Sequence, residues 1–147
     1  MFLSLRSTHF AIIFCSLIVS GCSGGSAEHI ERAAVSGTIT YAGKPLPEGT
    51  IQFVPDTDAS GKPLRGKAVQ TNITNGAYSL AAGQGPTVGT NKVLISAVKK
   101  TGKFEESDGQ KIEILKQYLP AKYNSNSTLK FEIQAGENTT DYALESK

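Results

Sequence analysis

An alternation of apolar and polar residues with a period of two is the feature that most constrains how this chain can fold. The segment VSGTITY (35–41) places Val35, Gly37, Ile39 and Tyr41 on one face and its Ser and Thr residues on the other. Because successive side chains of a strand point to opposite faces, this pattern predicts a half-buried strand. Six further strands are predicted in TIQFV (50–54), AVQTNI (68–73), the segment containing Tyr78 and Leu80, NKVLISAV (91–98), LKFEI (129–133) and DYALE (141–145).

Clusters of turn-forming residues separate these segments. They are AGKPLPEG (42–49), DTDASGKPLRG (56–66), AAGQGPTVG (81–89) and QAGEN (134–138). Asn75-Gly76 also supplies two residues that tolerate positive φ, which predicts a tight hairpin. The segment 91–98 is apolar on both faces, so it is predicted to be central in its sheet. Seven short strands with little helix favour an all-β fold, an antiparallel β-sandwich.

One segment departs from this alternation. In GQKIEILKQYLPAKYN (109–124), Ile112, Leu115 and Leu119 have helical spacing, and Pro120 would end a helix soon afterwards. We expect a long connection with one helical turn that covers an open edge of the sandwich.

The N-terminal segment has the pattern of a secretory signal. Residues 1–9 carry one cation, Arg6, and no acid, and FAIIFCSLIV (10–19) is apolar but shorter than the roughly 20 residues that span a bilayer. Val19-Ser20-Gly21-Cys22 then resembles the lipobox of bacterial lipoprotein precursors. The resemblance implies cleavage before Cys22, a diacylglyceryl thioether on its sulfur and an acyl chain on its amine. The alternative is an ordinary buried thiol at Cys22.

Three parts of the chain follow from this interpretation: a cleaved signal peptide (1–21), a lipidated cysteine with a flexible linker (22–33) and one domain (34–147). Cys15 would leave with the signal, which excludes a disulfide in the mature chain. The protein is expected to be exported and anchored to a bacterial membrane, inner or outer, facing the periplasm or the cell surface. With 15 Lys and Arg against 13 Asp and Glu and no basic cluster, nucleic acid is not an expected partner.

Two stretches of the domain carry a second resemblance, VSGTITYAGKPLPEGTIQFVP (35–55) and QTNITNGAYSLAAGQGPTVGTNKVLISA (70–97). They are similar to the carboxypeptidase regulatory-like domains of the transthyretin-like superfamily. The residues that carry the pattern are Val35, Gly37, Gly43, Pro45, Leu46, Gly49, Gly76, Tyr78, Gly89 and Val93. The resemblance implies a seven-stranded Greek-key β-sandwich of the prealbumin type. Its motif consists of turn glycines and core residues and specifies no reaction.

The domain lacks the residues of common catalytic sites. It contains neither His nor Cys, since His9 and His29 precede it, so a Ser-His-Asp triad and the usual zinc sites are excluded. Hydroxyisourate hydrolases of the same superfamily end in Tyr-Arg-Gly-Ser, whereas this chain ends LESK (144–147). We expect no enzymatic activity and no cofactor. The rival hypothesis is a weak hydrolase that uses Glu105, Glu106 or Asp108.

Two binding alternatives remain open. Asp56, Asp58 and Ser60 reproduce the first oxygen ligands of an EF-hand-like calcium loop, but Lys67 stands where its bidentate Glu belongs; the competing interpretation is a plain turn. Three tyrosines, Tyr41, Tyr118 and Tyr123, form either a carbohydrate platform or a seal over the sandwich edge with their hydroxyls outward.

The expected function is that of an envelope lipoprotein whose β-sandwich is a non-catalytic binding or structural module. Its partner would be a protein or a glycan, and it would meet the membrane through Cys22. The alternatives are a carbohydrate- or calcium-binding surface module and, behind these, a hydrolase.

Overall fold

The computed structural model describes residues 30–146, and within them the chain is all-β. The signal peptide, the lipobox Val19, Ser20 and Gly21, and Cys22 lie outside the described residues. The described residues form eleven strands: β1 (Ala34–Tyr41), β2 (Lys44–Pro45), β3 (Glu48–Thr57), β4 (Val69–Thr74), β5 (Ala77–Leu80), β6 (Gly89–Ser96), β7 (Val98–Ser107), β8 (Gln110–Gln117), β9 (Lys130–Ile133), β10 (Glu137–Thr139) and β11 (Tyr142–Leu144). Two short 3₁₀ helices, η1 (Ala82–Gln84) and η2 (Ala121–Tyr123), complete the elements.

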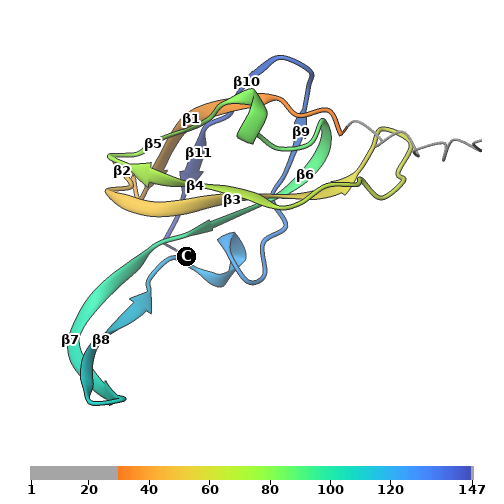
Figure 1. The fold of residues 1–147 in the computed structure, drawn as a ribbon. Coiled ribbons are helices and arrows are strands. Elements are labelled where there is room, and N and C mark those ends of the chain that lie inside the picture. The colour runs from red at the N-terminus through yellow and green to blue at the C-terminus, as the bar shows by residue number, and fades with distance from the viewer. Residues whose placement is uncertain (1–29, 147) are drawn as a thin grey trace, which may run out of the picture.

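Nine of these strands belong to one curled sheet. Its order is β10-β1-β5-β4-β3-β6-β9, with β2 and β11 also paired to β1. The curl places β1, β5 and β10 over β3, β4 and β6, so that two layers face each other (Figure 1). The core lies between these layers. Its residues include several that the sequence pattern placed together on one face of their strands and that have no exposed surface: Ile39, Ile51, Phe53, Val93 and Ile95.

Several sequence predictions are confirmed. The Asn75-Gly76 turn joins β4 to β5, and both residues have positive φ, 50° and 82°, as a two-residue hairpin turn of type I′ requires. Strand β6 is paired on both sides, with β3 and β9, and is therefore interior to its sheet. Local turn chemistry and hydrophobic period thus determined these elements.

The segment 109–124 is a correction. Instead of a connection with a helical turn, residues 110–117 form β8, which pairs antiparallel with β7 in a separate two-stranded sheet, so the seven predicted strands are too few. The turn between them is Asp108-Gly109, with φ values of 52° and 77°. This dipeptide is a hairpin signal, and it outweighs the helical spacing of Ile112 and Leu115. The helical turn comes after Pro120, as η2.

The boundary between spacer and domain also shifts. Ala33 falls in the predicted flexible linker (22–33), but it is fully buried and its N–H donates to the Pro86 carbonyl over 3.1 Å. The Glu31 carbonyl accepts from the N–H of Val88 over 3.0 Å. Residues 31–33 therefore belong to the folded domain, because these backbone groups are paired with it.

A carboxylate near β11 holds β1 in place and makes stability depend on pH. Asp141 Oδ1 accepts hydrogen bonds from the N–H and the Oγ1 of Thr38, over 2.6 and 2.8 Å. These bonds favour the ionised form and hold the pKa of Asp141 below its ordinary value of 3.8. A lowered pKa means that the contribution is complete above the unfolded-state pKa and is lost as the pH falls through the folded-state pKa.

We therefore expect the wild-type urea midpoint to decline below about pH 4 more steeply than that of Asp141→Asn. Asp108→Asn is the matched control, because it makes the same substitution in an exposed turn. Parallel curves for wild type and Asp141→Asn would contradict this assignment.

Candidate binding site

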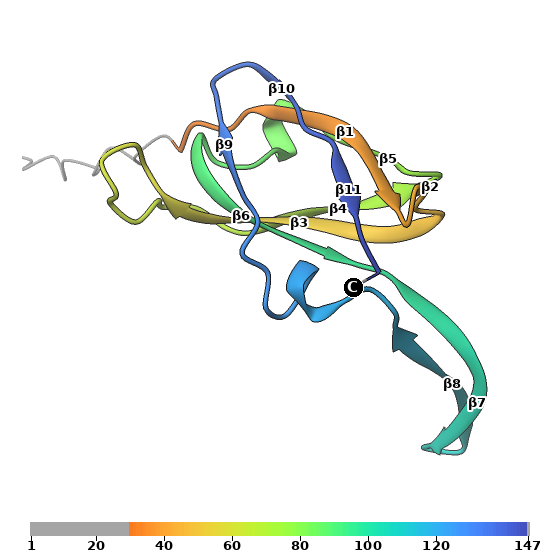
Figure 2. The ribbon, with the colours of Figure 1, turned by 180° about the vertical axis from the view of Figure 1, so that it is seen from behind.

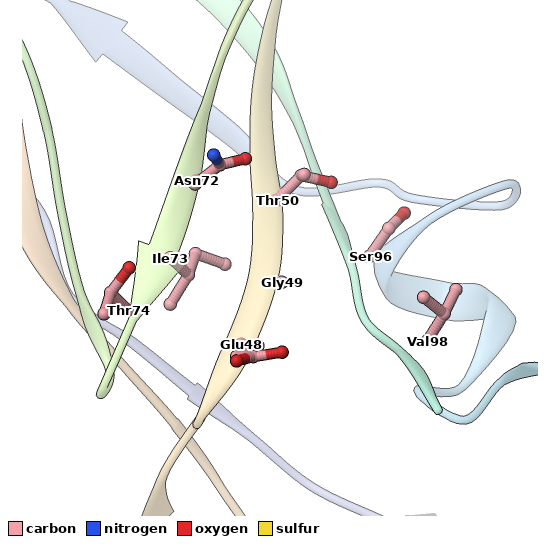
Figure 3. Close-up of a pocket in the computed structure, with 8 residues that line it drawn as sticks. All are labelled: Glu48, Gly49, Thr50, Asn72, Ile73, Thr74, Ser96 and Val98. Carbon is pink, nitrogen blue, oxygen red and sulfur yellow. The ribbon is translucent and has the colours of Figure 1, made fainter. Parts of the chain in front are cut away.

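The site is a groove on the outer face of the sheet, where β3 begins and β4 and β6 end. The strand register places three of its residues side by side across the sheet, in a row: Thr50 of β3 pairs with both Asn72 of β4 and Ser96 of β6. The next row contains Glu48, which pairs with Thr74. This hollow has a volume of about 420 Å³ (Figure 3).

Alternation along β3 explains why this face is polar. Ile51 and Phe53 point into the core with no exposed surface, so Thr50 and its outward neighbours point to solvent. The side chains of Thr50, Asn72, Thr74 and Ser96 make no hydrogen bond to another described group. Their donors and acceptors are therefore available to a ligand.

A second hollow of about 530 Å³ continues the first. The two share Glu48, Thr74 and Val98, and the second adds Pro47, Asn75, Lys99 and Tyr118. We call the combined depression the junction groove, because it lies where β6 leads into β7.

Tyr118 gives the junction groove one aromatic wall. Its ring contacts that of Tyr41 edge-on, with centroids 5.8 Å apart. Burial raises the pKa of Tyr118, with smaller contributions from Tyr41 and Glu48. The phenol therefore stays protonated at neutral pH and can donate a hydrogen bond.

The tyrosines do not form one platform. Tyr123 is 8% exposed, does not line the junction groove, and its hydroxyl accepts a hydrogen bond from the N–H of Glu145 over 2.9 Å. The expectation that the Tyr123 hydroxyl points outward is therefore wrong. Only Tyr118 of the three lines the groove.

The proposed calcium ligands have other partners. Asp58 Oδ1 accepts hydrogen bonds from the N–H of Ser60, the Oγ of Ser60 and the N–H of Lys62, each over 2.7–2.9 Å. Asp56 Oδ2 lies 2.6 Å from Lys130 Nζ. Within residues 30–146, no group of three or more His, Cys, Asp or Glu side chains is placed to hold a metal ion.

The carboxylates of the rival hydrolase hypothesis lie apart from the junction groove. Glu105 and Glu106 are on β7 and Asp108 is in its turn, and all three are exposed. None of them lines the groove. They face solvent on an open hairpin rather than a cleft in which carboxylates could act on a bound substrate.

Sequence reasoning did not single out Glu48, Thr50, Asn72 or Ser96 as site residues. Thr50, Asn72 and Ser96 share one signal, an outward position on a predicted strand, whereas Glu48 falls in the predicted turn cluster 42–49 and is part of β3 in the structure. Which of them are neighbours depends on register between strands, and alternation within one segment does not specify that.

The chain matches no family model and no curated protein. Within residues 30–146, no helix has the length and apolar character needed to cross a bilayer.

Proposed function

We propose that this chain is a membrane-anchored envelope lipoprotein whose domain is a non-catalytic binding module for a protein or glycan. The observation that carries the binding role is the junction groove, with its polar side chains in register and one aromatic wall. The lipobox residues Val19–Cys22 support the anchor.

The groove lies far from the point where the N-terminal segment enters the domain, which supports its being accessible to a partner. The chain enters the domain beside the loop after β3, where Ile30 and Glu31 line a hollow with Asp58 and Lys62. The junction groove begins at Glu48, at the opposite end of β3 (Figure 2). Ten strand residues span about 30 Å. A tether on the N-terminal side would therefore hold the groove away from the membrane.

The chemistry of the groove suits ligands with repeated polar groups. Neighbouring strands lie about 4.8 Å apart, so Asn72, Thr50 and Ser96 offer hydrogen-bonding groups at regular intervals. Sugar hydroxyls or the backbone of an extended peptide would satisfy them, and the Tyr118 ring offers an apolar face.

The roles of the motif residues support a carboxypeptidase regulatory-like sandwich. Val35, Leu46 and Val93 are at most 1% exposed and lie in the core. A Cβ at Gly37 would meet the Thr140 carbonyl oxygen, so the motif glycine allows two backbone segments to touch. The two facing layers of the curled sheet are consistent with the sandwich.

Photo-crosslinking of the full chain expressed in bacterial cells tests the proposal. A photoreactive amino acid replaces Asn72 in the junction groove or, as control, Glu132 on the exposed face of β9. We expect membrane-associated protein with a discrete adduct from position 72 and none from position 132. Cys22→Ser should remove the lipid mass from the intact protein.

The two parts of the proposal fail separately. A Cys22→Ser variant that weighs the same as the wild type, apart from the substituted atom, would contradict the anchor. Equal adducts from positions 72 and 132, or none from either, would contradict the groove as the binding site.

A further inference from the structure

The β7–β8 hairpin forms a sheet of its own, separate from the nine-stranded sheet. It projects from the body and pairs with no other strand (Figures 1 and 2). Five large apolar side chains of the described residues are exposed, and four of them are on this hairpin: Val98 (52%), Phe104 (60%), Ile112 (54%) and Leu115 (54%). An isolated two-stranded hairpin is only marginally stable in water, so pairing with additional strands would increase the stability of this one.

The two outer edges of the hairpin differ in their fitness for pairing. Strand β7 has a register irregularity between Lys100 and Phe104, and Gly102 there has a φ of 69°. Such irregularities block pairing at an edge. Strand β8 contains no residue with positive φ between Gln110 and Gln117. The free edge of β8 is therefore the one that can pair with another strand.

The sequence of β8 is complementary to itself when read in the opposite direction. Around Ile112, Lys111 lies on one side and Glu113 on the other. An antiparallel copy centred on Ile112 places Lys111 opposite Glu113 of the second copy, and Glu113 opposite the second Lys111. Opposite charges at facing positions stabilise a strand pair.

We propose that the hairpin binds the hairpin of a second copy, with the two β8 strands antiparallel about a two-fold axis at Ile112. The result is a four-stranded sheet, in which the two Ile112 side chains meet on one face. Each copy uses the same residues, as a two-fold interface requires. The proposed contact is the free edge of β8, no residue of which lines the junction groove, and it does not depend on the lipid anchor.

Neighbouring registers are less favourable. A centre at Glu113 would place two glutamates opposite each other, and a centre at Ile114 would place Glu113 opposite Leu115. Like charges at facing positions destabilise a pair, and the second register leaves the carboxylate facing an apolar side chain. The Ile112 register also overlaps only residues 110–114, next to the hairpin turn, so the two domains stay apart.

Disulfide trapping tests the register. In the full chain with Cys15→Ser and Cys22→Ser, purified in detergent, Ile112→Cys should give a cross-linked dimer under mild oxidation. Facing Cα atoms in an antiparallel pair are about 4.5–5.5 Å apart, within the range of a disulfide. Lys116→Cys is the matched control, because its two copies would be separated by eight residue steps, about 26 Å. We expect at least tenfold more dimer from Ile112→Cys.

A charge exchange tests the contacts without cysteine chemistry. Lys111→Glu should weaken the dimer at least tenfold by light scattering. Adding Glu113→Lys should restore it in part, because Glu113 also lies 3.5 Å from Lys100 Nζ and Lys111 also faces Glu106 within the hairpin. A protein that remains monomeric at all concentrations, as expected if the hairpin instead binds another protein, would overturn the proposal. Equal cross-linking at positions 112 and 116, or no restoration by the exchange, would overturn the register.

Discussion

Gly37→Ala is expected to lower the free energy of unfolding by about 3 kcal/mol. Gly37 lies on β1, and a Cβ built there would be 1.9 Å from the carbonyl oxygen and 2.7 Å from the carbonyl carbon of Thr140. Both atoms belong to the backbone, so no side-chain rotation relieves the clash. The segment of Thr140 must move away, which strains the contact between β1 and the chain that leads into β11.

Gly83→Ala is the control for this substitution. Gly83 lies in η1, where an added Cβ meets nothing within 4 Å. We expect a change of less than about 0.5 kcal/mol at this surface position. Urea unfolding followed by tyrosine fluorescence measures both variants. Equal urea midpoints for Gly37→Ala and Gly83→Ala would mean that β1 and Thr140 are not in contact.

Phe53→Ala is expected to cost about 4 kcal/mol of stability, because it leaves a cavity in the centre of the core. Phe53 has no exposed surface, and its ring centroid lies 6.3 Å from that of Tyr78 on the facing layer. The substitution removes the side chain that fills the space between β3 and β5. The remaining core residues can fill that space only in part.

Phe104→Ala removes the same atoms at a position that is 60% exposed. We expect it to change the stability of the monomer by less than about 0.5 kcal/mol, measured by urea unfolding at low protein concentration. A loss at Phe104 equal to that at Phe53 would show that the hairpin, rather than the curled sheet, forms the stable core.

Strand position and facing were largely determined by local sequence. The segments around Ile39 and Phe53 alternate so regularly that one face had to be buried, and Asn75-Gly76 determined the turn between β4 and β5. The segment 109–124 was misinterpreted because the spacing of Ile112, Leu115 and Leu119 satisfies a helix. The competing signal was local as well: Asp108-Gly109 favours a type I′ turn between two strands.

The sequence by itself determined an all-β chain, its principal buried residues and, through Cys22, the expectation of a tether. Tertiary structure decided which outward residues meet, since Thr50 lies between Asn72 and Ser96 only through the pairing of β3 with β4 and β6. It also decided that Ala33 is buried and that β7 and β8 leave the body of the sheet. The physical reason is range: alternation and turn preferences act over a few residues, whereas register is set by contacts between segments distant in sequence.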